Sequence, residues 1–154
     1  MIQEHQTLHV TNLISVRKTL TQAEVPPIIE KLAQYIKTYN ADKAGYLIST
    51  TFCVDQQTQK MDTIFYLPIN KEIPSSEDFV FKPHLYLINC VMIKYKGNPQ
   101  NMQPAVDGLT RHVQQNNLVP ISTLYSVNQN EILRQEDLDK FEVDIYMSIS
   151  PNIF

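Results

Sequence analysis

The chain carries an internal duplication, and no other feature of the sequence constrains its fold as strongly. Apolar patterns of the first half recur 77 positions later, without a gap, through three successive segments. The offset then grows to 80, where residues 62–69 match residues 142–149, so the second copy has three extra residues before its last strand. A constant offset over several segments indicates a repeated structural module. The segments with the offset of 77 are 13–18 with 90–95, 28–36 with 105–113, and 44–49 with 121–126.

Each copy has the pattern strand, helix, strand, strand. Residues 61–69 and 141–149 alternate apolar and polar side chains, which is typical of strands with one buried face. The second segment of each copy places apolar residues at the spacing of an amphipathic helix. We therefore expect an α+β fold in which two modules form an antiparallel sheet and the helices cover one face of it.

Prolines indicate where the two helices begin. Proline is accepted in the first turn of a helix, because the N–H that it lacks would have no partner there. The first helix is therefore expected to begin near Pro26. The second is expected to be capped by Asn101, with Pro104 in its first turn.

The duplication also sets the domain organisation. A chain of 154 residues suits a single domain. We divide residues 1–154 into module one at about 8–70, a linker at about 71–83 and module two at about 84–150. The linker contains the stretch Pro-Ser-Ser-Glu-Asp, whose composition favours a loop.

Charge and composition exclude several classes of protein. With 13 basic and 16 acidic residues the formal net charge is −3, whereas nucleic-acid-binding domains carry a basic face. No apolar run approaches the roughly 20 residues of a membrane span, and the polar N-terminal residues do not resemble a secretory signal.

Cys53 and Cys90 lack metal-ligand spacing and are interpreted as reduced thiols. We expect a cytoplasmic protein that binds neither nucleic acid nor membranes.

Standard catalytic and metal-binding motifs are absent from the sequence. It contains no Gly-x-Ser-x-Gly elbow, phosphate-binding loop, His-Glu-x-x-His or Cys-x-x-Cys motif. His5 and His9 have the spacing of two metal ligands on a helix, but no clear third ligand accompanies them. His112 occupies an apolar helical position, as a core histidine does. We expect no catalytic residue, no cofactor and no metal site.

Side chains on the polar faces of the last strands are the first candidate ligand-binding residues. Glu142 and Asp144 are separated by one residue, so on a strand their carboxylates point to the same face. Tyr146 and its counterpart Tyr66 point with them. Carboxylates beside aromatic rings suit a flat, cationic ligand. The alternative is a solvated sheet face whose charges have no other role.

The central strands provide a second candidate set. Tyr46 and Ile48 share one side of a strand in module one, and Thr123 and Tyr125 share the matching side in module two. An aromatic stripe of this kind also fits a packed core. Because two pseudo-symmetric modules leave a groove where their sheets meet, we expect a ligand pocket at that junction.

Two stretches of sequence resemble the GyrI-like (gyrase-inhibitor-like) effector-binding domain family of bacterial proteins. Ile-Ser-Val-Arg-Lys at 14–18 is similar to the first strand of the family, and Leu-Val-Pro-Ile-Ser-Thr-Leu-Tyr at 118–125 is similar to the stretch entering its pocket strand. The resemblance spans residues 10–149. It implies two strand-helix-strand-strand modules with a small, often cationic or aromatic ligand in the groove between them. Some members are hydrolases that use a glutamate on the pocket strand.

The sequence departs from the family pattern at two points. Thr123 stands where the resemblance implies the glutamate, and the chain has no tryptophan, a residue frequent in the preceding helix of the family. Since no helix-turn-helix segment precedes the domain, the resemblance implies a stand-alone member rather than a complete transcription regulator.

We interpret the chain as a non-catalytic small-molecule-binding protein with a groove between its modules. Two alternatives remain open: an accessory protein whose degenerate groove contacts a protein partner, and a hydrolase with Glu142 as its base. The ligand-binding residues of the main hypothesis are Tyr46, Ile48, Tyr66, Thr123, Tyr125, Glu142, Asp144 and Tyr146.

Overall fold

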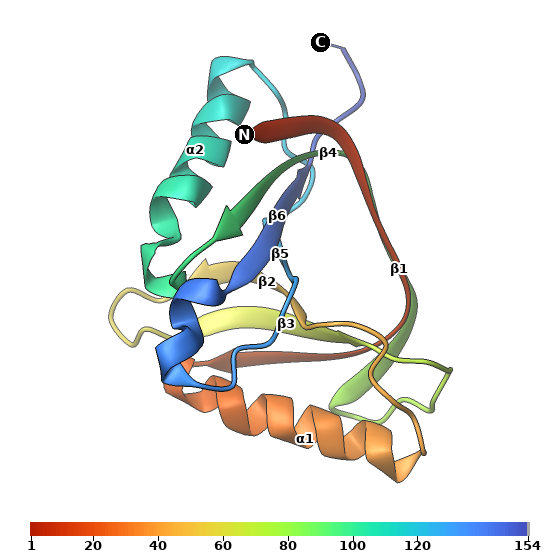
Figure 1. Ribbon diagram of the computed structural model, residues 1–154. Coiled ribbons are helices and arrows are strands. Elements are labelled where there is room, and N and C mark those ends of the chain that lie inside the picture. The colour runs from red at the N-terminus through yellow and green to blue at the C-terminus, as the bar shows by residue number, and fades with distance from the viewer. Residues whose placement is uncertain (154) are drawn as a thin grey trace. The chain divides into compact units, whose positions relative to one another are not determined.

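The computed structural model of the protein describes residues 1–153 and confirms the α+β fold, with antiparallel strands and one long helix in each half (Figure 1). The chain divides into two compact units. We call His9–Leu85 the first unit, and Met1–Leu8 together with the residues from Tyr86 onward the second unit. The elements in chain order are β1 (Ile2–Leu20), η1 (Gln22–Glu24), α1 (Val25–Thr38), β2 (Ile48–Val54), β3 (Met61–Pro68), β4 (Phe79–Lys96), η2 (Pro99–Asn101), α2 (Gln103–Gln115), β5 (Tyr125–Asn128), η3 (Gln135–Lys140) and β6 (Glu142–Ser148).

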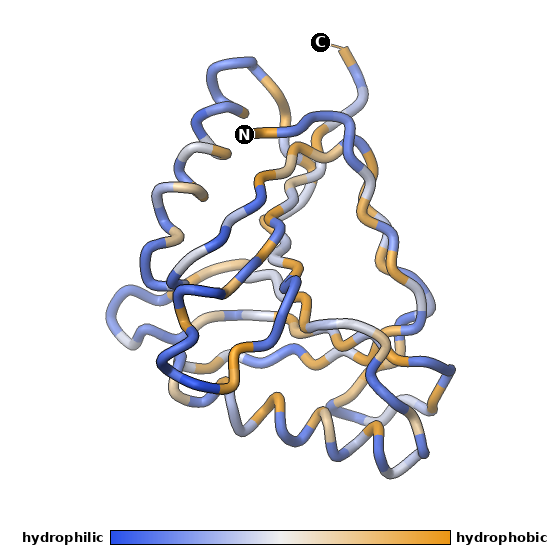
Figure 2. The backbone as a smooth tube through the Cα atoms, in the orientation of Figure 1, coloured by the Kyte–Doolittle hydropathy of each residue, from blue (hydrophilic) through white to orange (hydrophobic). Residues whose placement is uncertain are grey.

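In the first unit, β3 pairs with β1 on one side and with β2 on the other, both antiparallel. Alternate residues of these strands point to α1, which covers one face of the sheet (Figure 1). Leu32 and Ile36 of the helix are buried against that face. Apolar and polar positions alternate along α1 in Figure 2, as expected of a helix with one buried side. The buried sheet residues of this core are Ile14, Val16, Leu20, Phe65 and Leu67.

The second unit repeats this arrangement. β6 pairs with β4 on one side and with β5 on the other, both antiparallel. Leu109 and Val113 of α2 pack against the sheet, as the helical spacing of the sequence predicts. The buried sheet residues of this core are Val91, Val143 and Ile145.

The same loop closure occurs in both units. An isolated antiparallel bridge joins Lys43 to Ile69 in the first unit, and another joins Pro120 to Ile149 in the second. The two bridges are related by the offsets of 77 and 80 found in the sequence. The predicted duplication is therefore confirmed at the level of individual backbone contacts.

The prediction for the first helix is confirmed, with one addition. α1 begins at Val25 and carries Pro26 in its first turn. A 3₁₀ turn precedes it, and this turn starts with a capping box in which the backbone N–H of Thr21 donates to the Glu24 carboxylate at 3.0 Å. The capping box therefore stabilises the 3₁₀ turn, and the proline lies in the first turn of the α-helix that follows.

The prediction that Asn101 caps the second helix is wrong. The N-cap residue of α2 is Met102, which makes no side-chain capping bond, whereas Asn98 caps the preceding 3₁₀ turn, its Oδ1 accepting a hydrogen bond from the backbone N–H of Gln100 at 2.9 Å. This bond begins a 3₁₀ turn that ends at Asn101. α2 follows from Gln103 and has Pro104 in its first turn, as predicted.

β1 and β4 are longer than the sequence pattern indicates. β1 begins at Ile2, and β4 begins at Phe79, inside the stretch 71–83 that we interpreted as a linker. Asn12 in β1 and Asn89 in β4 adopt positive φ values. A left-handed residue interrupts the period-2 alternation by which strands are recognised, so only the second half of each strand is visible in the sequence.

Candidate functional site

The second unit brings several of the predicted site residues together on the sheet face that points away from α2. Tyr146 of β6 lies directly opposite Tyr125 of β5 on one side and Met92 of β4 on the other. Asp144 occupies the next row on the same face, opposite Val127. Tyr125 and Tyr146 are directly paired, with Cβ atoms roughly 4.5–5.5 Å apart, and Asp144 is a diagonal neighbour of Tyr125, at roughly 7–8 Å.

Asp144 is the electrostatic centre of this face. Its side chain is half-buried, and burial raises the pKa of its carboxyl group above the usual range. Glu142 raises it further, whereas Lys94, which pairs with Asp144 across the strands, lowers it. Burial also raises the pKa of the Tyr146 phenol, and the charge of Asp144 adds to that shift. This face therefore holds a carboxylate that is short of favourable solvation.

Glu142 has a different environment from Asp144. Its Oε1 lies 3.4 Å from the ammonium of Lys96, and its side chain is half-exposed. Its backbone N–H donates to Oδ1 of Asn130 at 3.0 Å, a bond that fixes the start of β6. An exposed ion pair of this kind contributes little to stability. Because Glu142 is the first residue of β6, its charge lies at the edge of the face.

The first unit has a hollow of about 290 Å³ on the sheet face that points away from α1. Side chains of β1 and β3 line it together with the chain from Glu77 to Lys82, and its charges are of both signs. Its volume approaches the roughly 300 Å³ at which small-molecule pockets begin. We call it the first-unit hollow, and its lining residues are Ser15, Arg17, Ile64, Tyr66, Glu77, Asp78, Val80 and Lys82.

Arg17 is one of the charged residues that line the first-unit hollow, and sequence reasoning did not identify it as a site residue. Its Nε and Nη2 donate to the two carboxylate oxygens of Asp62 at 3.0 and 2.8 Å. Its guanidinium carbon also lies 4.4 Å from the centre of the Phe52 ring, at a β-bulge of β2. Arg17 follows Ser15 by two positions along β1, so the two side chains point to the same face of the sheet. This spacing is the sequence signal that could have placed Arg17 on this face.

The other predicted site residues occupy different environments. Tyr66 is only 7% exposed and lines the first-unit hollow. Ile48 pairs with Tyr66 across the strands and is 1% exposed, so it offers little surface to a ligand. Tyr46 precedes β2 and is 49% exposed. Thr123 lies two residues before β5 and is half-buried.

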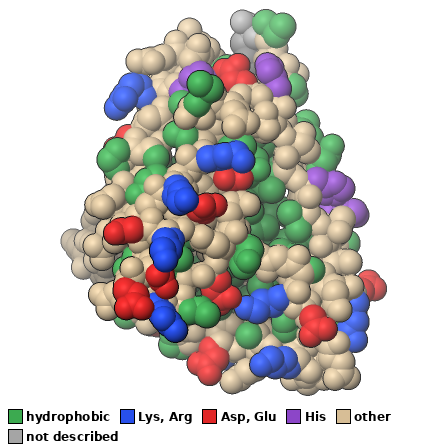
Figure 3. Space-filling view, viewed as in Figure 1, with side chains coloured by type: hydrophobic (Ala, Val, Ile, Leu, Met, Phe, Trp, Pro, Cys, Tyr) green, Lys and Arg blue, Asp and Glu red, His purple; other side chains and the backbone are tan. Residues whose placement is uncertain are grey.

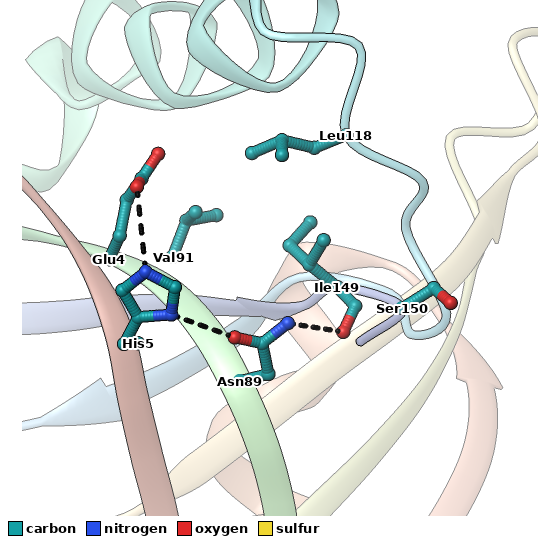
Figure 4. A pocket seen from close by; sticks show the side chains of 7 residues that line it. All are labelled: Glu4, His5, Asn89, Val91, Leu118, Ile149 and Ser150. Atoms are coloured by element: carbon teal, nitrogen blue, oxygen red, sulfur yellow. Dashed lines mark hydrogen bonds and ion pairs between the residues drawn. The ribbon is translucent and has the colours of Figure 1, made fainter. Parts of the chain in front are cut away.

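A smaller hollow, of about 70 Å³, lies in the second unit (Figure 4). Asn89 organises it, since its Nδ2 donates to the carbonyl of Ile149 at 3.1 Å and its Oδ1 lies 3.1 Å from Nδ1 of His5. Glu4 faces His5 from the same strand, with 4.0 Å between Oε2 of Glu4 and Nε2 of His5. This volume is sufficient for ordered water but well below that of an organic ligand.

The described part of the chain, residues 1–153, contains neither a cluster of metal ligands nor a helix that could span a membrane. In this range no group of three or more His, Cys, Asp or Glu side chains is arranged to hold a metal ion. Cys53 is exposed and Cys90 is buried, and both are free thiols. Within the same range no helix combines the length and the apolarity that crossing a bilayer requires.

Comparison with known proteins supports the fold through structure alone. No protein-family model matches the sequence, and no curated protein matches it. The EcmrR C-terminal domain superposes with a TM-score of 0.78 at 14% identity, covering 97% of this chain and 98% of that domain. EcmrR solved in a complex with DNA superposes with a TM-score of 0.76 at 14% identity. The match covers 96% of this chain but only 57% of that longer chain.

Two further solved structures share the fold at lower similarity. SAV2435, solved bound to tetraphenylphosphonium, has a TM-score of 0.54 at 13% identity, with 98% of this chain and 93% of that chain covered. A hydrolase from Listeria innocua has a TM-score of 0.60 at 10% identity, and the match covers 97% of this chain and 91% of the hydrolase chain. The protein therefore has the GyrI-like fold, as the resemblance in its sequence implies.

Proposed function

We propose that the protein binds a small organic cation without converting it, and that the ligand contacts Tyr125, Asp144 and Tyr146. The observation that carries this proposal is the half-buried carboxylate of Asp144, one row along the same sheet face from the paired phenol rings of Tyr125 and Tyr146. SAV2435, which shares the fold, was solved bound to tetraphenylphosphonium, a lipophilic cation. Thr123 and Glu142 complete the proposed contact set in the second unit.

The chemistry of this face favours a cation for two reasons. A carboxylate that has lost part of its hydration gains more from an opposite charge than an exposed carboxylate does. The faces of tyrosine rings attract cations as well, with roughly 0.5–2 kcal/mol per contact depending on solvent access. Lys94 already lies opposite Asp144, so the ligand would compete with its ammonium group.

A calorimetric titration with tetraphenylphosphonium tests the proposal. We expect saturable binding by the wild type, at least tenfold weaker binding by Asp144→Asn and by Tyr125→Ala, and weak or no binding of neutral triphenylphosphine oxide. Lys94→Gln should bind the cation more tightly, because the competing ammonium is removed. Asp107→Asn is the matched control, since Asp107 is an exposed carboxylate on α2. Equal affinities of the wild type and Asp144→Asn would refute the proposal.

The predicted residues of the first unit form a second set within the proposal and are tested separately. These are Tyr46, Ile48 and Tyr66, and Tyr46 is the one whose exposure makes it safe to truncate. If Tyr46→Ala weakens binding as Tyr125→Ala does, Tyr46 belongs to the residues on which binding depends. An effect of Tyr125→Ala alone would assign the ligand to the second unit.

Two other functions follow from other outcomes of the same titration. The fold shared with a Listeria innocua hydrolase makes hydrolysis with Glu142 as the base the second candidate, and turnover of a panel of nitrophenyl esters by the wild type and by Glu142→Gln tests it. A folded sample that binds no cation and turns over no ester would favour the protein-partner hypothesis. Co-purification of a stoichiometric partner from the native cell would then support that function.

A further inference from the structure

Two histidines that are 75 positions apart in the sequence meet in the first unit. His9 belongs to β1 and His84 to β4. Nε2 of His9 lies 3.1 Å from Nδ1 of His84, and the two rings stack with their centres 5.3 Å apart and their planes at 27°. Both side chains are exposed, and histidine atoms are visible at the surface in Figure 3. A pair of imidazoles with facing ring nitrogens is therefore open to solvent.

The separation of the two nitrogens matches that of two ligands on one metal ion. A histidine nitrogen binds Zn²⁺ at about 2.0–2.1 Å. Two such bonds at an angle between 90° and the tetrahedral value bring the nitrogens roughly 2.9–3.4 Å apart. The observed 3.1 Å falls within that range. Each neutral imidazole carries one nitrogen lone pair and one N–H, and in the tautomers whose N–H groups lie on Nδ1 of His9 and Nε2 of His84 both facing nitrogens offer their lone pairs to a metal ion.

We propose that His9 and His84 together bind one divalent transition-metal ion, of the class of Ni²⁺, Cu²⁺ or Zn²⁺, with water completing its coordination. Imidazole nitrogen suits these borderline metals, whereas Mg²⁺ and Ca²⁺ prefer oxygen ligands. Exposure of both rings lets the ion arrive from solvent and keep its water ligands. With two protein ligands, the affinity is expected to be lower than that of a four-ligand structural zinc site.

The other two histidines provide internal controls, because each has a different partner within the second unit. His5 lies against Asn89, and Nε2 of His112 lies 2.8 Å from Oε1 of Glu4. Neither belongs to a pair of facing imidazole nitrogens. Removing one of them alters the number of histidines in the protein while leaving the His9–His84 pair intact.

Calorimetric titration of the full chain, freed of any affinity tag, with Ni²⁺ tests the proposal. We expect one ion per chain, a rise in melting temperature on saturation, and no response to Mg²⁺. His84→Gln and His9→Gln should each weaken Ni²⁺ binding at least tenfold and abolish the rise in melting temperature. His5→Gln and His112→Gln should bind Ni²⁺ like the wild type. Circular dichroism of each metal-free variant verifies that it is folded.

Three results would overturn the proposal. One is unchanged Ni²⁺ affinity in folded His84→Gln, and another is a loss confined to His5→Gln or His112→Gln, which would locate the ion in the second unit. The third is absence of binding by the wild type at millimolar Ni²⁺. Because Asp144 and Tyr125 are not involved, the outcome is independent of the cation-binding proposal.

Discussion

Asn12 and Asn89 are structural equivalents, 77 positions apart, with the same unusual backbone conformation. Their φ values are 56° and 52°, in the left-handed region. The backbone carbonyl of Asn12 accepts the N–H of Ile69 at 2.8 Å, and that of Asn89 accepts the N–H of Ile149 at 3.2 Å. Asparagine tolerates this conformation better than other residues with a side chain. The duplication has thus kept a strained backbone position and its hydrogen bond in both units.

Alanine at Asn12 should destabilise the protein, because a left-handed backbone costs about 1–2 kcal/mol for an ordinary L-residue. Asn12→Gly should be close to neutral, since glycine adopts positive φ without that cost. Urea denaturation measures both free energies of unfolding. If Asn12→Ala and Asn12→Gly had equal stability, backbone strain would not be the cause.

Asn89→Gly should cost more than Asn12→Gly, although the backbone conformation is the same. The Asn89 side chain donates to the carbonyl of Ile149, and glycine removes that bond, which contributes on the order of 1 kcal/mol. The same denaturation experiment measures this difference. Equal effects of the two glycine substitutions would show that the side-chain bond contributes nothing.

Gly108→Ala should stabilise the protein by about 0.5–1 kcal/mol, because alanine is the better helix former. Gly108 lies in α2, and a methyl group added there would meet no atom within 4 Å. Gly97→Ala is the contrasting variant. Its φ is 145° and the new methyl group would lie 2.9 Å from the hydroxyl of Tyr95, so this variant should be destabilised. Thermal melts of the two variants are expected to shift in opposite directions.

The ion pair of Asp62 with Arg17 should make stability depend on pH on the acid side. The hydrogen bonds from Arg17 lower the pKa of Asp62 below its value in the unfolded chain. The stabilisation is therefore present above the unfolded pKa, near 3.9, and is lost as the pH falls through the lower folded value. Melting temperatures measured from pH 6 down to pH 2.5 should fall less steeply for Asp62→Asn than for the wild type. Parallel curves would contradict this assignment, and Asp107→Asn is the control.

Asp144→Asn should have opposite effects on stability and on cation binding. Burial raises the folded pKa of Asp144, so the folded state holds the proton more tightly and loses stability as the pH rises from the unfolded pKa through the folded one. An amide removes this penalty, so the variant should melt higher than the wild type at pH 7 while binding tetraphenylphosphonium more weakly. Loss of both properties would indicate a structural role for the carboxylate instead.

The helices and the second halves of the long strands could be predicted because their signals are local. Leu32 and Leu109 share the offset of 77, both lie at apolar helical positions, and both are fully buried. Pro26 and Pro104 fall in the first turns of their helices. Spacing and proline chemistry act within a few residues, and one sequence is enough to reveal them.

The remaining parts depend on contacts between distant residues. Pairing of His9 with His84 requires knowledge of how β1 and β4 meet, and the sequence pattern of neither strand contains it. Arg17 and Phe52 come together only because a β-bulge in β2 shifts the register by one residue. A single-residue shift reverses the direction of every later side chain, so patterns read along one strand cannot locate such contacts.

Residues 1–8 belong to the second unit, although the first unit follows them in the sequence. Glu4 contacts His112 and His5 contacts Asn89, both encoded far downstream. Residues 1–8 are synthesised before the first unit, whereas their partners Asn89 and His112 are synthesised after it. The first unit has all of its residues once Leu85 has emerged. Translation therefore completes the first unit before the second, and residues 1–8 can contact Asn89 and His112 only after the whole first unit has been synthesised.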